Sequence, residues 1–363
     1  MRAPWSANRL GLDYRAEAER LGAPPAPIID IHSHIHGLKA AAVYREAREL
    51  YGVTTTYTMS RIGEAPGLKE LLGDSIQFIA VPEFMAEDRK HAHTEGFLEA
   101  IEQFHALGSR IVKFWTAPRA RDYGKEAGDP LLMSLDNEWR QRAMDLADSL
   151  GMMFMAHIAD PDTWFRTKYA DASFYGTKRE QYEPFERALE AHPSPWIGAH
   201  MGGWPEDLEF LDGLLSRHDN LHLDTSATKW MVRELSLHSR SEFVAFLEKW
   251  KGRILFGSDI VTMDEHLTEE DDPAKMKAAQ ARGRNEAFEL YASRYWALRT
   301  LFETEYEGES PIADPDLAMV NPARHDEMSA PALRGMSVPE DVLRVIYHDA
   351  ARDLVEQWRA EHP

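Results

Sequence analysis

The sequence of 363 residues contains no cysteine. This absence excludes disulfides, thiolate nucleophiles, cysteine-ligated zinc and iron–sulfur clusters. Basic residues are outnumbered by acidic ones, because 41 Lys and Arg stand against 61 Asp and Glu and leave a net charge of −20. Such a charge repels nucleic acid and anionic lipid. We therefore expect no nucleic-acid partner.

Long apolar runs are also missing. No stretch approaches the roughly 18 residues that a membrane-spanning helix needs. The N-terminal residues lack the continuous apolar core of a signal peptide. We therefore expect a cytoplasmic protein with no membrane partner. The 44% hydrophobic and 10% aromatic residues argue against disorder and suffice for a sizeable core.

Short, bulky apolar runs recur along the chain, with amphipathic helical patterns between them. We expect buried strands at residues 28–34, 53–58, 76–81, 110–115, 152–157, 196–200, 221–224 and 254–259. The helical patterns include residues 39–51, 94–107 and 137–150, and a last helix at 339–358. Eight strands alternating with helices predict an α/β fold, a (β/α)8 TIM barrel.

One long segment between the eighth strand and the last helix breaks this alternation. Residues 262–336 are acidic, with Glu269, Glu270, Asp271 and Asp272 in a row. Residues 282–306 have a helical pattern, whereas 308–331 are rich in Pro, Ser and Asp and look like loop. We interpret 262–336 as an insertion within a single domain that covers residues 1–363. It could form a lid, a contact in a homo-oligomer or simply a solvated acidic surface.

Polar residues with metal-binding chemistry end the first expected strand. The alternation of a strand puts Asp30, His32 and His34 on one face, so two imidazoles project side by side. A divalent metal needs this geometry from one short segment. The alternative is a pair of polar residues whose hydrogen bonds are satisfied inside a buried barrel.

Other expected strands end on residues of the same kind. His157 closes strand five, His200 closes strand six and Asp259 closes strand eight. In TIM barrels, catalytic groups come from the C-terminal ends of several strands. This pattern favours a metal centre over a set of unrelated core histidines.

Taken in order, these motifs resemble the amidohydrolase superfamily, specifically its amidohydrolase-2 branch. The resemblance rests on DIHSH at 30–34, FMAHIADP around His157, GAHMGGWPEDL around His200, DTS at 224–226 and FGSD ending at Asp259. The closing VPEDVLRVIYHDAARDLV is also similar to the last helix of that branch. The motifs extend from residue 28 to 355, nearly the whole chain.

The resemblance implies a metal bound by His32, His34, His157 and Asp259. Zn²⁺ suits these ligands, with Mn²⁺ as an alternative, and we favour one ion per chain over two. Asp259 would be the general base that activates the metal-bound hydroxide. His200 would be either a second-site ligand or a catalytic group that polarises the substrate oxygen.

Lys113, in the fourth expected strand, has two interpretations. Two-metal members of the superfamily carry a carboxylated lysine there, which bridges the metals and would make Lys113 a second-site ligand. The alternative is an ordinary ammonium group paired with a carboxylate. We favour the ordinary ammonium group.

Residues that follow the expected strands suggest the substrate. Arg61 and Arg119 could hold a carboxylate by forked hydrogen bonds, or they could neutralise acidic neighbours. Trp115 and Trp204 could stack on a substrate, or they could anchor loops at the barrel rim. Together these residues indicate a small, carboxylate-bearing substrate.

The leading hypothesis is a metal-dependent hydrolase of an amide, ester or lactone bond in a small organic acid. Because the family also includes non-oxidative decarboxylases of aromatic or unsaturated carboxylic acids, a lyase is the first alternative. The second alternative is a non-catalytic, metal-containing binding barrel.

Overall fold

The computed structural model describes residues 5–268 and 280–362. The chain divides into two compact units. The first comprises Met1–Thr58, Gly63–Ile76 and Thr225–Ala351, and the second comprises Met59–Ile62, Gln77–Asp224 and Arg352–Pro363. The acidic run at residues 269–272 lies outside the described residues. The organisation as one domain with an insertion at 262–336 stays a prediction.

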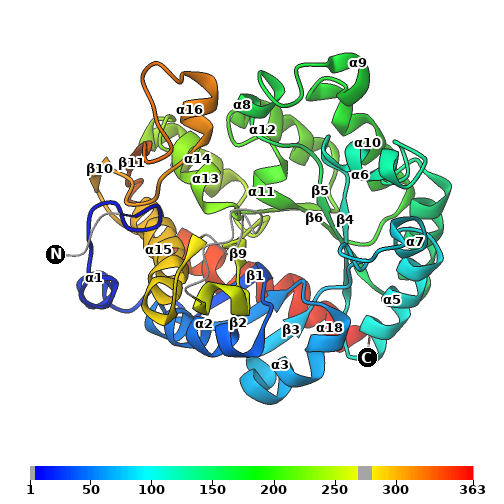
Figure 1. The fold of residues 1–363 in the computed structure, drawn as a ribbon, viewed down its shortest axis with the longest axis horizontal. Coiled ribbons are helices and arrows are strands. Elements are labelled where there is room, and N and C mark those ends of the chain that lie inside the picture. Colours follow the sequence, from blue (N-terminus) through cyan, green and yellow to red (C-terminus); the bar gives the residue numbers. More distant parts are fainter. Residues whose placement is uncertain (1–4, 269–279, 363) are drawn as a thin grey trace. The chain divides into compact units, whose positions relative to one another are not determined.

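Three parallel strands of the first unit position the polar side chains of the first strand. Strand β1 (Ile28–His34) lies between β2 (Val53–Thr58) and β9 (Ile260–Val261), as Figure 1 shows. The apolar side chains of Ile29 and Ile31, which share one face of β1, are buried. This burial fixes the register of the strand, so that its polar side chains are placed on the opposite face.

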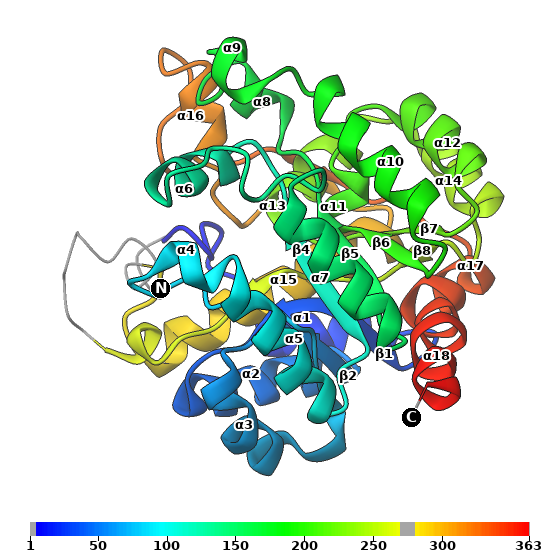
Figure 2. The ribbon, with the colours of Figure 1, turned by 90° about the vertical axis from the view of Figure 1, so that its right-hand side faces the viewer.

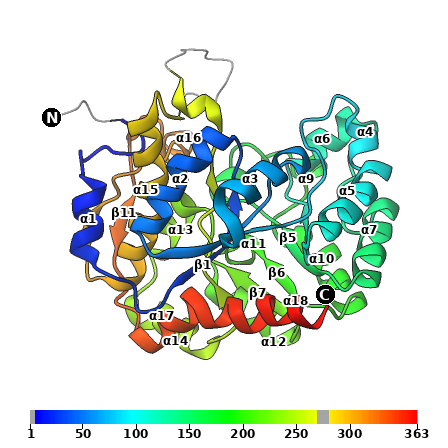
Figure 3. The same ribbon diagram turned by 90° about the horizontal axis from the view of Figure 1, so that it is seen from below.

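Three helices of this unit lie side by side in Figure 3: α1 (Tyr14–Leu21), α2 (Leu38–Leu50) and α15 (Arg284–Glu303). Helix α15 confirms the helical pattern expected at 282–306. Buried residues occur along all of α15, as in a helix surrounded by protein. Within the parts that the structure describes, no helix is both long enough and apolar enough to cross a membrane.

Shorter elements complete the first unit. They are α3 (Ala65–Leu72), α13 (Thr228–Leu235), α14 (Arg240–Lys249), β8 (Ile254–Leu255), the antiparallel pair β10 (Glu307–Glu309) and β11 (Ala332–Arg334), α16 (Asp316–Val320) and α17 (Glu340–Arg344). The loop expected at 308–331 therefore contains a short helix, α16. Strand β3 (Ile76–Phe78) continues the chain into the second unit.

The second unit contains four adjacent parallel strands. They are β4 (Ile111–Trp115), β5 (Met153–His157), β6 (Trp196–Gly198) and β7 (Leu221–Asp224), seen together in Figure 2. The main helices here are α5 (Glu95–Ala106), α7 (Glu138–Ser149), α10 (Tyr182–Ala191) and α12 (Leu208–Arg217). Asn137 caps α7 by accepting the Trp139 N–H at 3.0 Å, and Asp207 caps α12 in the same way.

All eight expected strands are present, and the α/β class with parallel strands is confirmed. Three strands end earlier than expected, because β3 ends at Phe78, β6 at Gly198 and β8 at Leu255. His200 and Asp259, which were expected to close β6 and β8, both have a φ of 58°. Left-handed backbone cannot continue a strand. The prediction that His200 and Asp259 close their strands is therefore wrong, since both lie on the turns that follow.

The expected last helix is irregular. Between α17 and α18 (Gln357–Glu361) the chain forms two π-helical turns, at Val345–Asp349 and Arg352–Glu356. In the first of these turns the Ile346 carbonyl accepts the Phe256 N–H at 3.0 Å. The widened helix therefore bonds, through this carbonyl, to the residue that follows β8.

Candidate metal centre

Three of the four proposed ligands lie in the first unit and converge there. Atom Nε2 of His34 lies 3.2 Å from Oδ1 of Asp259, and Nε2 of His32 lies 3.6 Å from the same oxygen. The ligand atoms of these three residues all lie within 4.8 Å of one another. His32 is fully buried, whereas the side chains of His34 and Asp259 are each 29% exposed. The cluster is therefore closed at His32 and accessible at Asp259.

Ser226 controls the orientation of the His32 ring. Its Oγ lies 3.0 Å from Nδ1 of His32, and both groups are buried. A cation on Nε2 requires the ring proton to be on Nδ1, which then donates to Ser226 Oγ. This contact leaves Nε2 facing Asp259.

The turn that carries Asp259 has a costly backbone conformation. A non-glycine residue at positive φ costs on the order of 1–3 kcal/mol, and such residues cluster at functional sites. Asp259 has this conformation, and its N–H donates to the His32 carbonyl at 2.8 Å. Ala227, next to Ser226, is also left-handed, with a φ of 67°. The strained positions thus adjoin the metal-binding cluster.

This donor set fits a divalent transition-metal ion. Two imidazole nitrogens and one carboxylate oxygen suit Zn²⁺ and Mn²⁺. Asp30 shares a face of β1 with the two histidines, but its oxygens accept hydrogen bonds from Ser258, Tyr295 and the His32 N–H. Burial raises the pKa of Asp30 to about 7, and these hydrogen bonds oppose the shift.

The fourth proposed ligand, His157, ends strand β5 in the second unit. Its Nε2 lies 3.0 Å from Oδ1 of Asp160, whose Oδ2 accepts the Tyr169 hydroxyl at 2.8 Å. A carboxylate behind a histidine is the usual way in which a ligand ring is oriented. Asp160 was not identified from the sequence, although it lies only three residues after His157.

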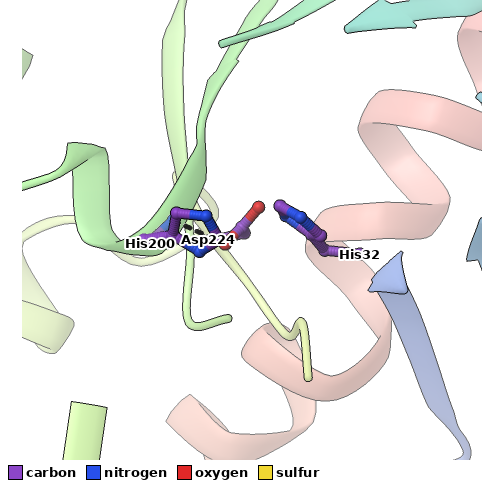
Figure 4. A group of neighbouring side chains, drawn as sticks. All are labelled: His32, His200 and Asp224. Carbon is purple, nitrogen blue, oxygen red and sulfur yellow. Dashed lines mark hydrogen bonds between the residues drawn. The ribbon is translucent and has the colours of Figure 1, made fainter. Parts of the chain in front are cut away.

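His200 lies beside His157, with the two ring centroids 4.5 Å apart in an edge-to-face arrangement. Its left-handed backbone is held by its own N–H, which donates to Oδ1 of Asp224 at 2.9 Å (Figure 4). Asp224 is fully buried at the end of β7. The motif that contains Asp224 was noticed in the sequence, but its contact with His200 was not foreseen.

Lys113 and the two arginines lie in different environments. Lys113 is 6% exposed in the middle of β4. Arg61 and Arg119 are exposed on loops. The roles of all three stay predictions.

The two tryptophans pack on other aromatic rings. Trp115 packs edge-on against Phe84 and Tyr123, at 5.9 and 5.1 Å between centroids. Trp204 is stacked on Tyr182 at 5.7 Å and also contacts Phe210. This packing is what loop anchoring requires. Stacking of either ring on a substrate stays a prediction.

Comparisons with known proteins identify a family. The family model described as Amidohydrolase (Amidohydro_2) matches residues 30–356. A search of curated proteins returned no significant match.

Among solved structures, the chain is similar to a probable 2-pyrone-4,6-dicarboxylic acid hydrolase from Acinetobacter baumannii. The identity is 11%, the TM-score is 0.44, and the match covers 81% of this chain and 98% of that one. It is also similar to the IDCase of Metarhizium anisopliae, at 12% identity, TM-score 0.40, and 91% and 81% coverage. A 2,6-dihydroxybenzoate decarboxylase matches at 13% identity, TM-score 0.38, and 93% and 99% coverage. Likenesses this distant do not assign a reaction.

Removal of the Ser226 hydroxyl tests the cluster. We expect Ser226→Ala to weaken Zn²⁺ binding roughly 10–100-fold, because the His32 ring loses the partner that fixes its tautomer. Competition with a chromogenic chelator measures the affinity. The control is Ser33→Ala, which removes another buried hydroxyl at β1, one that donates to the Tyr57 carbonyl at 3.0 Å. Equal affinities in the two variants would contradict the role of Ser226.

Proposed function

The chain belongs to the amidohydrolase family and is an enzyme of that superfamily, and we propose that it is a metal-dependent hydrolase. Its substrate would be an amide, ester or lactone of a small organic acid. The convergence of His32, His34 and Asp259 carries the proposal, because it joins a buried ligand to an accessible carboxylate.

We propose that His32, His34, His157 and Asp259 hold one Zn²⁺ or Mn²⁺. The family resemblance supports including His157, and so does the carboxylate of Asp160 behind its ring. When bound, such a cation lowers the pKa of a coordinated water to about 7 and polarises a carbonyl oxygen. Lys113 would remain an ordinary ammonium group.

Asp259 is proposed as the general base. Its partial exposure lets its carboxylate reach the attacking water, accept a proton and pass it to the leaving group. One oxygen of Asp259 is enough for its second function as a ligand, so the other oxygen can accept the proton. His200, held through its N–H by Asp224, would polarise the substrate oxygen.

Two cations of the first unit support an acidic substrate. Lys229 lies in the first turn of α13, next to Thr228, whose hydroxyl donates to the Ser258 carbonyl at 3.1 Å. Arg294 lies on α15, where its Nη1 donates to Ser293 Oγ at 3.0 Å. Among the described residues, neither cation forms an ion pair with a carboxylate within 4.0 Å.

Electrostatic effects connect Arg294 with Asp259, and Lys229 with Arg294. Burial lowers the pKa of Arg294 to about 10, and Tyr14 and Asp259 oppose this shift. Burial and the nearby Arg294 lower the pKa of Lys229 to about 8, whereas Asp314 and Asp316 oppose that shift. We infer that Lys229 and Arg294 bind the carboxylate of the substrate near Asp259, where an anion would offset the repulsion between them.

A product screen tests the reaction. Lactones, N-acyl amino acids and aryl carboxylates are incubated with metal-loaded enzyme, and acid release and CO₂ release are measured separately. We expect acid release, and we expect Asp259→Asn to lower the rate roughly 100-fold or more because the base is lost. Release of CO₂ without release of acid would show that the reaction is decarboxylation and not hydrolysis. Full turnover in Asp259→Asn would contradict the assignment of the base.

The dependence of KM on pH tests the carboxylate site. Lys229 is cationic below its pKa of about 8 and neutral above it, so substrate affinity is expected to fall as the pH rises through 8. Lys229→Arg keeps its charge up to pH 10, so this rise in KM should disappear. A KM that rises equally in both proteins would show that another group is responsible.

A further inference from the structure

We propose that Tyr295, on helix α15, acts through Asp30 as a positioning residue for the Asp259 turn. Helix α15 belongs to the segment that the sequence suggested was an insertion, so part of that segment would support the metal centre. The inference rests on the proposed function only in taking Asp259 as a ligand and base.

Asp30 accepts hydrogen bonds from two directions. Its Oδ1 accepts the backbone N–H groups of His32 at 3.2 Å and of Ser258 at 3.0 Å. Its Oδ2 accepts the hydroxyls of Ser258 at 2.6 Å and of Tyr295 at 2.8 Å. Asp30, Ser258 and Tyr295 are at most 1% exposed. One buried carboxylate thus links β1, the turn after β8 and α15.

Ser258 transmits this link to Asp259. Its hydroxyl donates to Asp30 and accepts the Ile260 N–H at 3.2 Å, so it is bonded on both sides of the turn. The Asp259 N–H donates to the His32 carbonyl at 2.8 Å. Asp259 keeps its left-handed conformation only while such contacts offset the strain. Asp30 therefore helps to determine where the Asp259 carboxylate points.

The Tyr295 hydroxyl belongs to a longer chain of buried hydrogen bonds. Because its one proton goes to Asp30, the proton in its contact with Tyr44, at 2.7 Å, comes from the Tyr44 hydroxyl. The same reasoning makes Thr56 donate to Tyr44, at 2.9 Å. The chain starts at the buried cation Arg48, whose Nη1 donates to Thr56 Oγ1 at 3.3 Å.

All donors in this chain point toward Asp30. Hydrogen bonds that run in one direction polarise and strengthen one another in a low-dielectric interior. The terminal donor, Tyr295, therefore has an orientation that its neighbours impose, and it holds Oδ2 of Asp30 toward Ser258. Tyr295→Phe would keep the ring packing and remove the bond to Asp30, together with the contact to the Tyr44 hydroxyl.

Tyr295→Phe tests the inference, with Tyr291→Phe as the matched control. Tyr291 lies one turn away on the same helix, is equally buried, and contacts Nδ1 of His266 at 2.9 Å instead of Asp30. Both variants lose one buried hydroxyl, so a purely structural effect should lower the melting temperature of the metal-free protein in both. The readouts are Zn²⁺ affinity and the visible spectrum of the Co²⁺-substituted protein.

Of the two tyrosine variants, we expect only Tyr295→Phe to lower Zn²⁺ affinity, roughly 10–100-fold, and to change the Co²⁺ spectrum. Ser258→Ala should do the same, because it breaks the next bond toward Asp259. Equal affinities and spectra for the 295 and 291 variants would overturn the inference, and so would a wild-type protein that binds neither ion. Neither readout needs a substrate, so a failure to find hydrolysis would count against the proposed function and leave this inference standing.

Discussion

A buried carboxylate, Asp30, holds together the part of the first unit in which the chemistry is placed. It accepts two hydrogen bonds from Ser258, one from the backbone of His32 and one from Tyr295. Burial of a carboxylate away from water costs free energy unless its oxygens accept hydrogen bonds. These four donors provide the compensation, and through them one strand, one turn and one helix have fixed positions relative to each other.

The exposure of the cluster differs between its members, and the chemistry follows from that difference. His32 is buried and its ring contacts Ser226, so we propose it only as a ligand. Asp259 is accessible, lies on a strained turn and faces both histidines. A metal ligand that also moves a proton needs this combination of fixed backbone and open side chain. Arg294 and Lys229 are the cations that we propose for the carboxylate of the substrate.

The sequence predicted those parts of the site that depend on local periodicity. Strand alternation was enough to place His32 and His34 together, since β1 is long and buried. The strand conformation expected for His200 and Asp259 was wrong, and their chemical roles stay predictions. Both were assigned to strands because apolar runs lie shortly before them, and composition does not reveal a left-handed φ in a non-glycine residue.

Contacts distant in sequence could not be predicted. Tyr295 lies 265 residues from Asp30, and no periodic signal connects them. Ser226 and Asp224 were noticed only as part of a motif after a strand, without a partner. Lys229 and Arg294 were not singled out in the sequence, because burial and not residue type changes their pKa.

The amount of metal bound per chain tests the central claim most directly. Elemental mass spectrometry on untagged protein, after incubation with Zn²⁺ or Mn²⁺ and removal of free ions, gives this stoichiometry. The account predicts about one ion per chain, which is lost when His34 or Asp259 is replaced by alanine. Two ions would require a second site with Lys113 or His200 as ligands. No bound ion, or equal binding by wild type and both variants, would contradict the metal centre and the mechanism built on it.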